Sequence, residues 1–201
     1  MKRHVLWIAM AGMLVAALGA SAQEREVVAN EGTIGDRWML AEGTTALPIP
    51  IYPADQAQRG DNVCLALGYR ILPDGTTSNF RVLKQWSSSS GEKEPFAGYW
   101  ESFARAAADA VSQWRFQPRP GTGDAVPTVT VATLGFSGNP DKRAVDVGGN
   151  CRIANLNDRL AQLGIKRFSD RSITAHSEFH RRQRMGEVMA ADAAAHRQRR
   201  P

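Results

Sequence analysis

Apolar residues alternate with other residues from Val63 to Ile71, the clearest pattern of this kind in the chain. Residues two apart lie on the same side of a β-strand, so this spacing predicts a strand with one apolar face on a core. Pro73-Asp74-Gly75 follows, and its proline and glycine favour a turn. A second run, Thr76 to Gln85, places Phe80 and Val82 on one side. Together the two runs predict a β-hairpin.

A spacing of three to four residues between apolar positions extends from Ala97 to Trp114. Residues at this spacing share one face of a helix, so the segment predicts an amphipathic helix. Its apolar face consists of Trp100, Phe103, Ala107, Ala110, Val111 and Trp114. Alternation returns from Val126 to Phe136 and predicts a third strand. Pro127 favours an edge position for this strand, because proline cannot donate to a β-ladder.

The segments before the hairpin have weaker patterns. Residues 23–47 form a polar leader, in which we expect one short strand around Trp38 to Leu40. The three prolines between Pro48 and Pro53 exclude a helix there. A short helical turn is expected at Ala54 to Gln58.

The chain beyond the third strand is predicted to consist of a linker and a tail. Residues 138–150 are polar and contain glycine, as linkers do, and residues 151–201 are basic. We expect the tail to be helical or partly disordered, because few apolar residues stand among its arginines. One short helix is predicted from the helical spacing of Ile153, Leu156, Leu160 and Leu163, with Gly164 as its C-terminal cap.

The first 22 residues have the pattern of a secretory signal peptide. Lys2 and Arg3 precede an apolar run from Val5 to Ala20, and Ala20-Ser21-Ala22 fits the small-residue cleavage rule. The run is shorter than the roughly 20 residues that span a bilayer. We therefore expect a periplasmic protein cleaved near Ala22; the alternative is an inner-membrane protein anchored by an uncleaved signal.

The net charge of +5 conceals an asymmetry along the chain. Residues 23–150 carry a charge of −3, whereas residues 151–201 carry +6. A basic tail on an exported protein points to an anionic membrane or cell-wall surface, with Arg181, Arg182 and Arg184 as candidate contacts, and nucleic acid is not an expected partner there. The alternative is a tail that is merely solvated.

The chain contains two cysteines, Cys64 and Cys151. An even number in an oxidising compartment permits one disulfide, which would join the tail to the body. The alternative is that Cys64 is a small buried strand residue and Cys151 a free thiol.

Residue patterns for catalysis are weak. Gly135-Phe136-Ser137-Gly138-Asn139 lacks the final glycine of a nucleophile elbow. His176 and His180 have the spacing of two ligands on one helical face, but no third zinc ligand can be identified. We expect no enzyme activity, no cofactor and no metal; a zinc enzyme using these histidines remains a minor alternative.

The order of several motifs resembles the TonB C-terminal domain family. Over about residues 48–137 the chain presents Tyr52-Pro53, Ala57, Gly60, the alternating strand, Pro73-Asp74-Gly75, the amphipathic helix and Trp114-Arg115-Phe116-Gln117-Pro118. The resemblance implies an α+β domain in which one helix packs on a small three-stranded antiparallel sheet, in the order β-β-α-β. This order agrees with the elements predicted above.

The resemblance also implies a function. In the family, the domain engages an extended segment of outer-membrane transporters by adding a strand to the sheet edge. An envelope protein, such as an outer-membrane TonB-dependent transporter, is therefore the expected partner. The residues expected to bind it are Tyr52, Thr128, Val129, Thr130, Val131, Ala132, Thr133 and Leu134. Tyr52 could instead seat the chain on the helix or sheet, and the edge could be self-protected or paired in a homodimer.

Two departures from the family limit the expected function. Only about 25 residues separate Ala22 from Pro48, at most about 80 Å even when fully extended, where energy-transducing members have a long proline-rich spacer. Ile49 occupies the place of a glutamine found in transporter-binding members. We therefore do not expect this chain itself to couple to the proton-motive force. The alternative function is a structural envelope protein whose tail binds an anionic surface.

Overall fold

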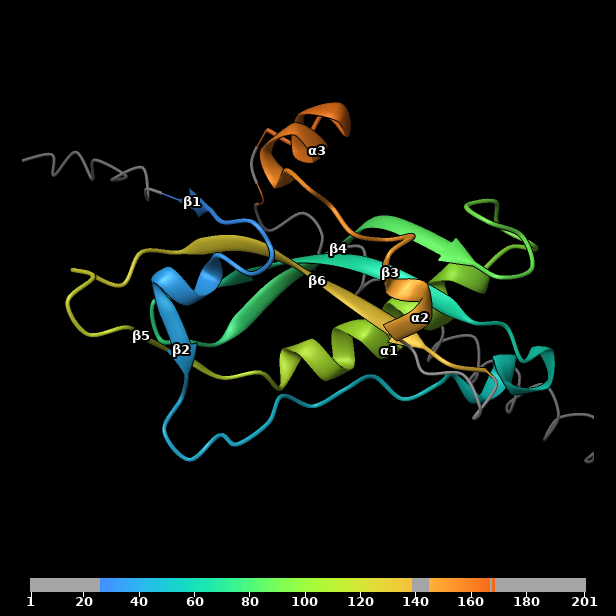
Figure 1. The fold of residues 1–201 in the computed structure, drawn as a ribbon, viewed down its shortest axis with the longest axis horizontal. Helices are drawn as coiled ribbons and strands as arrows, with labels where there is room; N and C mark the ends of the chain where they lie inside the picture. The colour runs from blue at the N-terminus through green and yellow to red at the C-terminus, as the bar shows by residue number, and fades with distance from the viewer. Residues whose placement is uncertain (1–25, 139–144, 167, 169–201) are drawn as a thin grey trace, which may run out of the picture.

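The computed structural model describes residues 26–138, 145–166 and 168, and it contains two β-sheets (Figure 1). The larger sheet has the strand order β1-β6-β3-β4, with bounds Val27–Val28 (β1), Thr128–Phe136 (β6), Val63–Ile71 (β3) and Thr77–Ser87 (β4). The smaller sheet pairs β2 (Trp38–Leu40) with β5 (Phe116–Pro118). The helices are α1 (Tyr99–Ser112), α2 (Val145–Gly148) and α3 (Leu156–Gln162), with 3-10 turns at Ile34–Asp36 and Ala54–Arg59.

Most of the predicted elements are confirmed. The hairpin, the amphipathic helix, the third long strand, the short strand at Trp38–Leu40 and the helical turn after Pro53 are all present. The three-stranded sheet is wrong in detail, because β1 adds a fourth strand and β5 forms a second small sheet. Both of the missed strands are only two or three residues long, too short to show a period of two.

Strand β3 is the centre of the larger sheet. All nine of its residues pair antiparallel with β6, from Val63 opposite Phe136 to Ile71 opposite Thr128. Its pairing with β4 is also antiparallel, but two register shifts interrupt it. One of them lies beside Asn79, whose φ of 56° places a non-glycine residue in the left-handed region.

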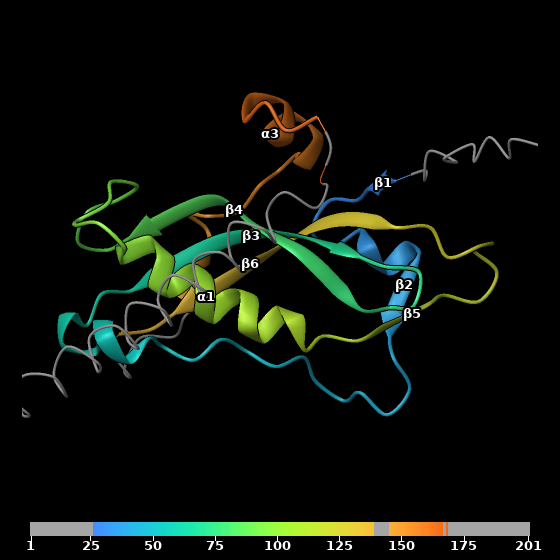
Figure 2. The same ribbon diagram turned by 180° about the vertical axis from the view of Figure 1, so that it is seen from behind.

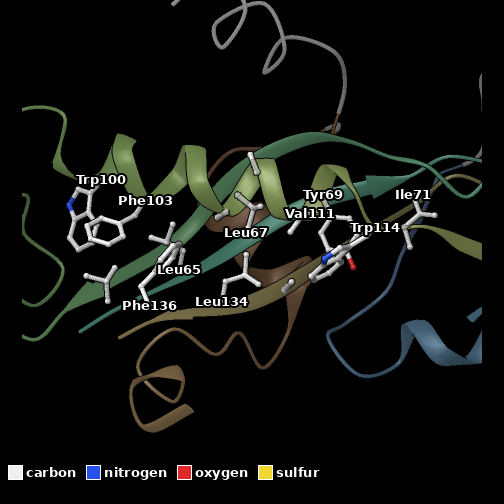
Figure 3. Packing of buried hydrophobic residues seen from close by; sticks show 14 of the residues in the cluster. Leu65, Leu67, Tyr69, Ile71, Trp100, Phe103, Val111, Trp114, Leu134 and Phe136 are labelled. Carbon is white, nitrogen blue, oxygen red and sulfur yellow. The ribbon is translucent and has the colours of Figure 1, made fainter. Parts of the chain in front are cut away.

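Helix α1 covers one face of this sheet. Alternate residues of β3 and β6 point toward it, and Figure 3 shows Leu65 and Phe136 beside Phe103 of the helix. Trp114 is buried beyond the end of the helix, where its ring lies edge-on to Tyr69 and its Nε1 donates to the Pro48 carbonyl at 2.8 Å. Trp114, which the sequence assigned to the apolar face of the helix, is therefore buried as expected, although the helix ends at Ser112.

The C-terminal region covers the opposite face, so the sheet is buried on both sides (Figure 2). The predicted short helix is confirmed as α3, with Asn155 capping its start and Gly164 in the left-handed conformation after its end. The cluster on this face combines residues of β3, β4 and β6 with the C-terminal region: Ala66, Leu83, Val129, Val131, Ile153, Leu156, Leu160 and Phe168. The packed body therefore continues well past residue 137, where the sequence predicted a linker.

A disulfide joins Cys64 of β3 to Cys151, 87 residues later, and both are fully buried. The predicted bond is confirmed, and the alternative of a free thiol is excluded. The bond fixes the C-terminal region to the central strand immediately before the residues that cover the second face.

The chain has three tyrosines, Tyr52, Tyr69 and Tyr99, and burial raises the pKa of each above its ordinary value. The carboxylate of Asp61 raises the pKa of Tyr52 and Tyr99 further. Because each pKa is higher in the folded than in the unfolded chain, the neutral phenols stabilise the fold fully below about pH 10, and this contribution is lost as the pH rises toward the folded pKa.

We therefore expect the native protein to show little tyrosinate absorbance at about pH 10, where an exposed tyrosine is half ionised. The free energy of unfolding should fall as the pH rises further. A Tyr69→Phe variant has no phenol to ionise at this buried position, so it should lose less stability than the unmodified protein between about pH 10 and 12. Half-ionised tyrosines in the folded protein at about pH 10 would contradict this expectation.

Candidate peptide-binding edge

Strand β6 presents alternate peptide groups to the side away from β3. Successive residues of a strand direct their N–H and C=O groups to opposite sides. The Ala29 N–H donates to the Val129 carbonyl at 2.9 Å, which places the outward groups at Val129. The same alternation directs the peptide groups of Val131, Thr133 and Gly135 outward and those of the even-numbered residues toward β3.

The leader covers the first part of this edge. Strand β1 pairs with β6 in parallel, with Val27 opposite Thr128 and Val28 opposite Val129. The Val27 N–H also donates to the Pro127 carbonyl at 3.0 Å. The prediction that β6 is a free edge is therefore wrong at Thr128 and Val129, because a segment without a hydrophobic period supplies the pairing strand.

Glu31 covers an outward group further along the strand, beyond Val131. Its carboxylate accepts the Thr133 N–H at 2.5 Å and the Thr133 hydroxyl at 2.6 Å. The neighbouring Asn30 side chain accepts the Leu156 N–H at 2.8 Å, so the leader is also tied to the start of α3. The carboxylate thus satisfies an amide that, on a paired strand, a backbone carbonyl would satisfy.

The rest of the outward edge has no such cover. Within residues 26–138, 145–166 and 168, no hydrogen bond from another segment reaches the outward peptide groups of Val131 or Gly135 or the carbonyl of Thr133. Thr133 and Gly135 are half-buried rather than enclosed. The edge from Val131 to Gly135 can therefore offer several hydrogen-bonding groups to an added strand.

The opposite edge of the sheet, along β4, is protected by its own chain. Ser87 and Gly91 exchange two backbone hydrogen bonds, at 2.8 and 2.9 Å. The guanidinium of Arg159 donates twice to the Leu83 carbonyl, at 2.9 and 2.6 Å. Between these two protected positions only Gln85 directs its peptide groups outward, so the stretch of β4 from Leu83 to Ser87 offers a shorter edge than β6.

The predicted partner-binding residues fall into two groups in the structure. Thr128, Thr130, Ala132 and Leu134 are buried and direct their peptide groups toward β3. Val129, Val131 and Thr133 carry outward peptide groups, and Val129 is already paired with the leader. The prediction missed Gly135, which continues the outward series, and Glu31. The alternation of a strand predicts that the even-numbered and odd-numbered residues direct their peptide groups to opposite sides. Only a hydrogen bond to a neighbouring segment shows which of the two groups faces outward.

Tyr52 lies within the body of the protein rather than on this edge. Its hydroxyl donates to the Asp61 carbonyl at 3.0 Å, and its ring lies edge-on to Phe103, with ring centroids 5.4 Å apart. The Asp61 carboxylate in turn accepts from Tyr99 at 3.0 Å and from Arg59 at 2.9 Å. These contacts favour the seating role for Tyr52.

Several other predicted residues lie outside the described part of the chain. They are the signal segment, His176, His180, Arg181, Arg182 and Arg184. Among the residues that the structure describes, no three His, Cys, Asp or Glu side chains are grouped to hold a metal ion, and no helix is long and apolar enough to cross a membrane. Ser137, the serine of the incomplete nucleophile-elbow motif, contacts the Asn62 side chain at 3.4 Å. All four histidines lie outside the described ranges.

The fold and this edge define an α+β protein whose sheet is covered on both faces. Among the described residues, part of one sheet edge has no hydrogen-bonding partner. No protein-family model matches the chain, and no curated protein matches it. Among solved structures, the chain is similar to the TonB C-terminal domain of Pseudomonas aeruginosa, with 26% identity, 49% of this chain and 85% of that chain covered, and a TM-score of 0.36. It is also similar to the TonB2 protein of Vibrio anguillarum, with 18% identity, 67% and 97% covered, and a TM-score of 0.31. Both are TonB proteins, the family that the motif order resembles.

Proposed function

We propose that this is a non-enzymatic periplasmic protein that binds an extended peptide segment of an envelope partner by strand addition to β6, within TonB-type transport. One observation carries the proposal: β6 already accepts an extended segment of its own chain, through the bond from Ala29 to Val129. Beyond that bond, the outward groups from Val131 to Gly135 continue the same edge. An outer-membrane TonB-dependent transporter is the partner that the motif resemblance suggests.

The buried disulfide supports a location outside the cytoplasm. Structural disulfides persist in oxidising compartments such as the periplasm. Cys64 and Cys151 are both fully buried and bonded. A signal segment cleaved near Ala22 would deliver the chain to that compartment.

A second candidate function, binding of an anionic surface, is favoured by a basic hollow beside β4. The hollow has a volume of about 310 Å³ and is lined by Lys84, Arg152 and Arg159, with Asp158 as the one carboxylate. None of the three cations forms an ion pair with a described residue. The positively charged tail would extend such a surface, with Arg182 and Arg184 as its candidate contacts.

Two proline substitutions test which edge binds the partner. Thr133→Pro removes an outward N–H from β6, and Gln85→Pro removes one from β4, while both leave the bonds to β3 in place. We expect Thr133→Pro to reduce partner capture by about tenfold or more, as the loss of a strand hydrogen bond and a steric clash with the added strand predict. Gln85→Pro should leave capture unchanged.

The measurement is a periplasmic crosslinking experiment with a photoreactive residue at Gly135, at Gln85 or at Arg182. A transporter captured from Gly135, and lost in the Thr133→Pro background, would support strand addition on β6. Capture from Gln85 alone would move the site to β4 and overturn the proposal. Capture from Arg182 alone would make the basic tail the functional surface.

A further inference from the structure

The leader residues Val27–Glu31, here called the leader hook, follow β6 along the edge that the proposed partner would use. We infer that the leader hook is an internal ligand of β6, and that a partner strand must displace it. The part of this inference that concerns the partner rests on the proposed function. The part that concerns the hook rests on its own contacts and can be tested without a partner.

The leader hook binds the outward side of β6 and of the residue before it, but it leaves Val131 without a bond. Val27 bonds to Pro127, Ala29 bonds to Val129, and Glu31 bonds twice to Thr133. Two further contacts tie the leader to segments other than β6. Glu26 forms an ion pair with Arg70 at 3.2 Å before the hook, and Asn30 accepts from Leu156 within it.

The contacts of the leader hook are suited to exchange. Its paired strand has two residues, whereas β6 and β3 pair over nine. Val27 and Val28 are only half-buried, and Glu31 is exposed. Short, exposed pairings open more readily than buried strands. A partner strand of several residues can therefore replace the hook by forming more hydrogen bonds with the same edge.

Glu31 is the residue that decides whether an added strand can continue past Val129. Its carboxylate occupies the Thr133 amide, so a strand that reaches Thr133 must first move Glu31 away. The edge is free only in the fraction of molecules in which Glu31 has left the Thr133 amide. The apparent affinity for an added strand is lowered in proportion to that fraction.

Hydrogen exchange tests the Glu31 contact directly in the full protein. We expect the Thr133 amide to exchange about tenfold faster or more in Glu31→Ala, because its acceptor is lost. Glu31→Gln keeps an acceptor oxygen and should lie between Glu31→Ala and the unmodified protein. Glu42→Ala removes an exposed glutamate outside the hook and should change nothing. Equal Thr133 exchange in Glu31→Ala and the unmodified protein would overturn the inference.

A peptide added in trans tests whether the edge is held by the hook. The probe is a synthetic peptide with the sequence of residues 23–33, followed through the amide chemical shifts of Thr133 and Gly135. Ala29→Pro removes the N–H that bonds to Val129, whereas Val28→Pro removes one directed away from β6. We expect the peptide to bind Ala29→Pro about tenfold more tightly than the unmodified protein or Val28→Pro. Equal affinity for all three proteins would contradict an internal ligand.

The two proposals fail in distinguishable ways. A peptide that binds Ala29→Pro, together with no transporter crosslinked from Gly135, would leave the leader hook established and overturn the proposed function. A transporter crosslinked equally by the unmodified protein and Glu31→Ala would support partner binding on β6 but overturn the hook as its competitor.

Discussion

Replacement of Gly75 by alanine should strongly destabilise the native fold. Gly75 lies in the hairpin turn with a φ of +80°, and its carbonyl accepts the Phe116 N–H at 2.9 Å. A Cβ at this position would lie 1.8 Å from the Phe116 carbonyl oxygen and 2.7 Å from its carbon. These are backbone atoms, so no side-chain rotation relieves the collision. We expect a loss of more than about 4 kcal/mol, a large part of the stability of an ordinary domain.

Gly121→Ala is the matched control. Gly121 has nearly the same φ, +84°, but its Cβ would meet no atom within 4 Å. The free energy of unfolding of this variant should fall by only about 1 kcal/mol, the cost of placing alanine in the left-handed conformation. Urea unfolding followed by circular dichroism compares the two. Similar midpoints for both variants would show that β5 does not lie against the hairpin turn as described.

The long elements could be predicted because each has a pattern that repeats several times. Strand β3 has its large apolar residues on one face, and helix α1 has one apolar face. Their periods of two and about 3.6 are distinct over nine and 14 residues. Helix α3 could be predicted from its spaced leucines and from the glycine that follows its end. In these segments, local pattern and tertiary packing favour the same structure.

The sequence of β6 itself indicates that both faces of the sheet are covered. Val129 and Val131 alternate with Ala132 and Leu134 on the other side, so this strand is apolar on both faces. A strand of this kind is expected to be buried on both sides. Gly68 gives a second signal, because a Cβ there would lie 2.8 Å from a Leu83 carbon and 2.9 Å from a Phe168 carbon.

The leader hook could not be predicted from local pattern. Two paired residues show no period, and the contact between Glu31 and Thr133 joins residues 102 positions apart. The alternating pattern predicted the strand, and Pro127 predicted that it lies at a sheet edge. Neither showed which segment lies against it. Such pairings depend on the path of the whole chain, which local hydrophobic spacing does not specify.

Loss of the disulfide should produce the other large decrease in stability. The bond between Cys64 and Cys151 closes a loop of about 88 residues, for which loop-closure entropy gives a stabilisation of about 4.5 kcal/mol as an upper figure. We expect a Cys64→Ala/Cys151→Ala variant to lose most of this amount, together with a smaller cost for the buried sulfur atoms that are removed. Urea unfolding midpoints give the comparison.

Unfolding the unmodified protein with and without reductant distinguishes the contribution of the disulfide bond from that of the cysteine side chains. Reductant should lower the midpoint of the unmodified protein and leave that of the double alanine variant unchanged. Equal midpoints for the oxidised and reduced protein would contradict the expected contribution. The same bond bears on the binding edge, because Cys151 is followed closely by Leu156, whose N–H holds Asn30 of the leader hook. If the C-terminal region loosens after reduction, the Thr133 amide should exchange faster, which would link the covered face of the sheet to its edge.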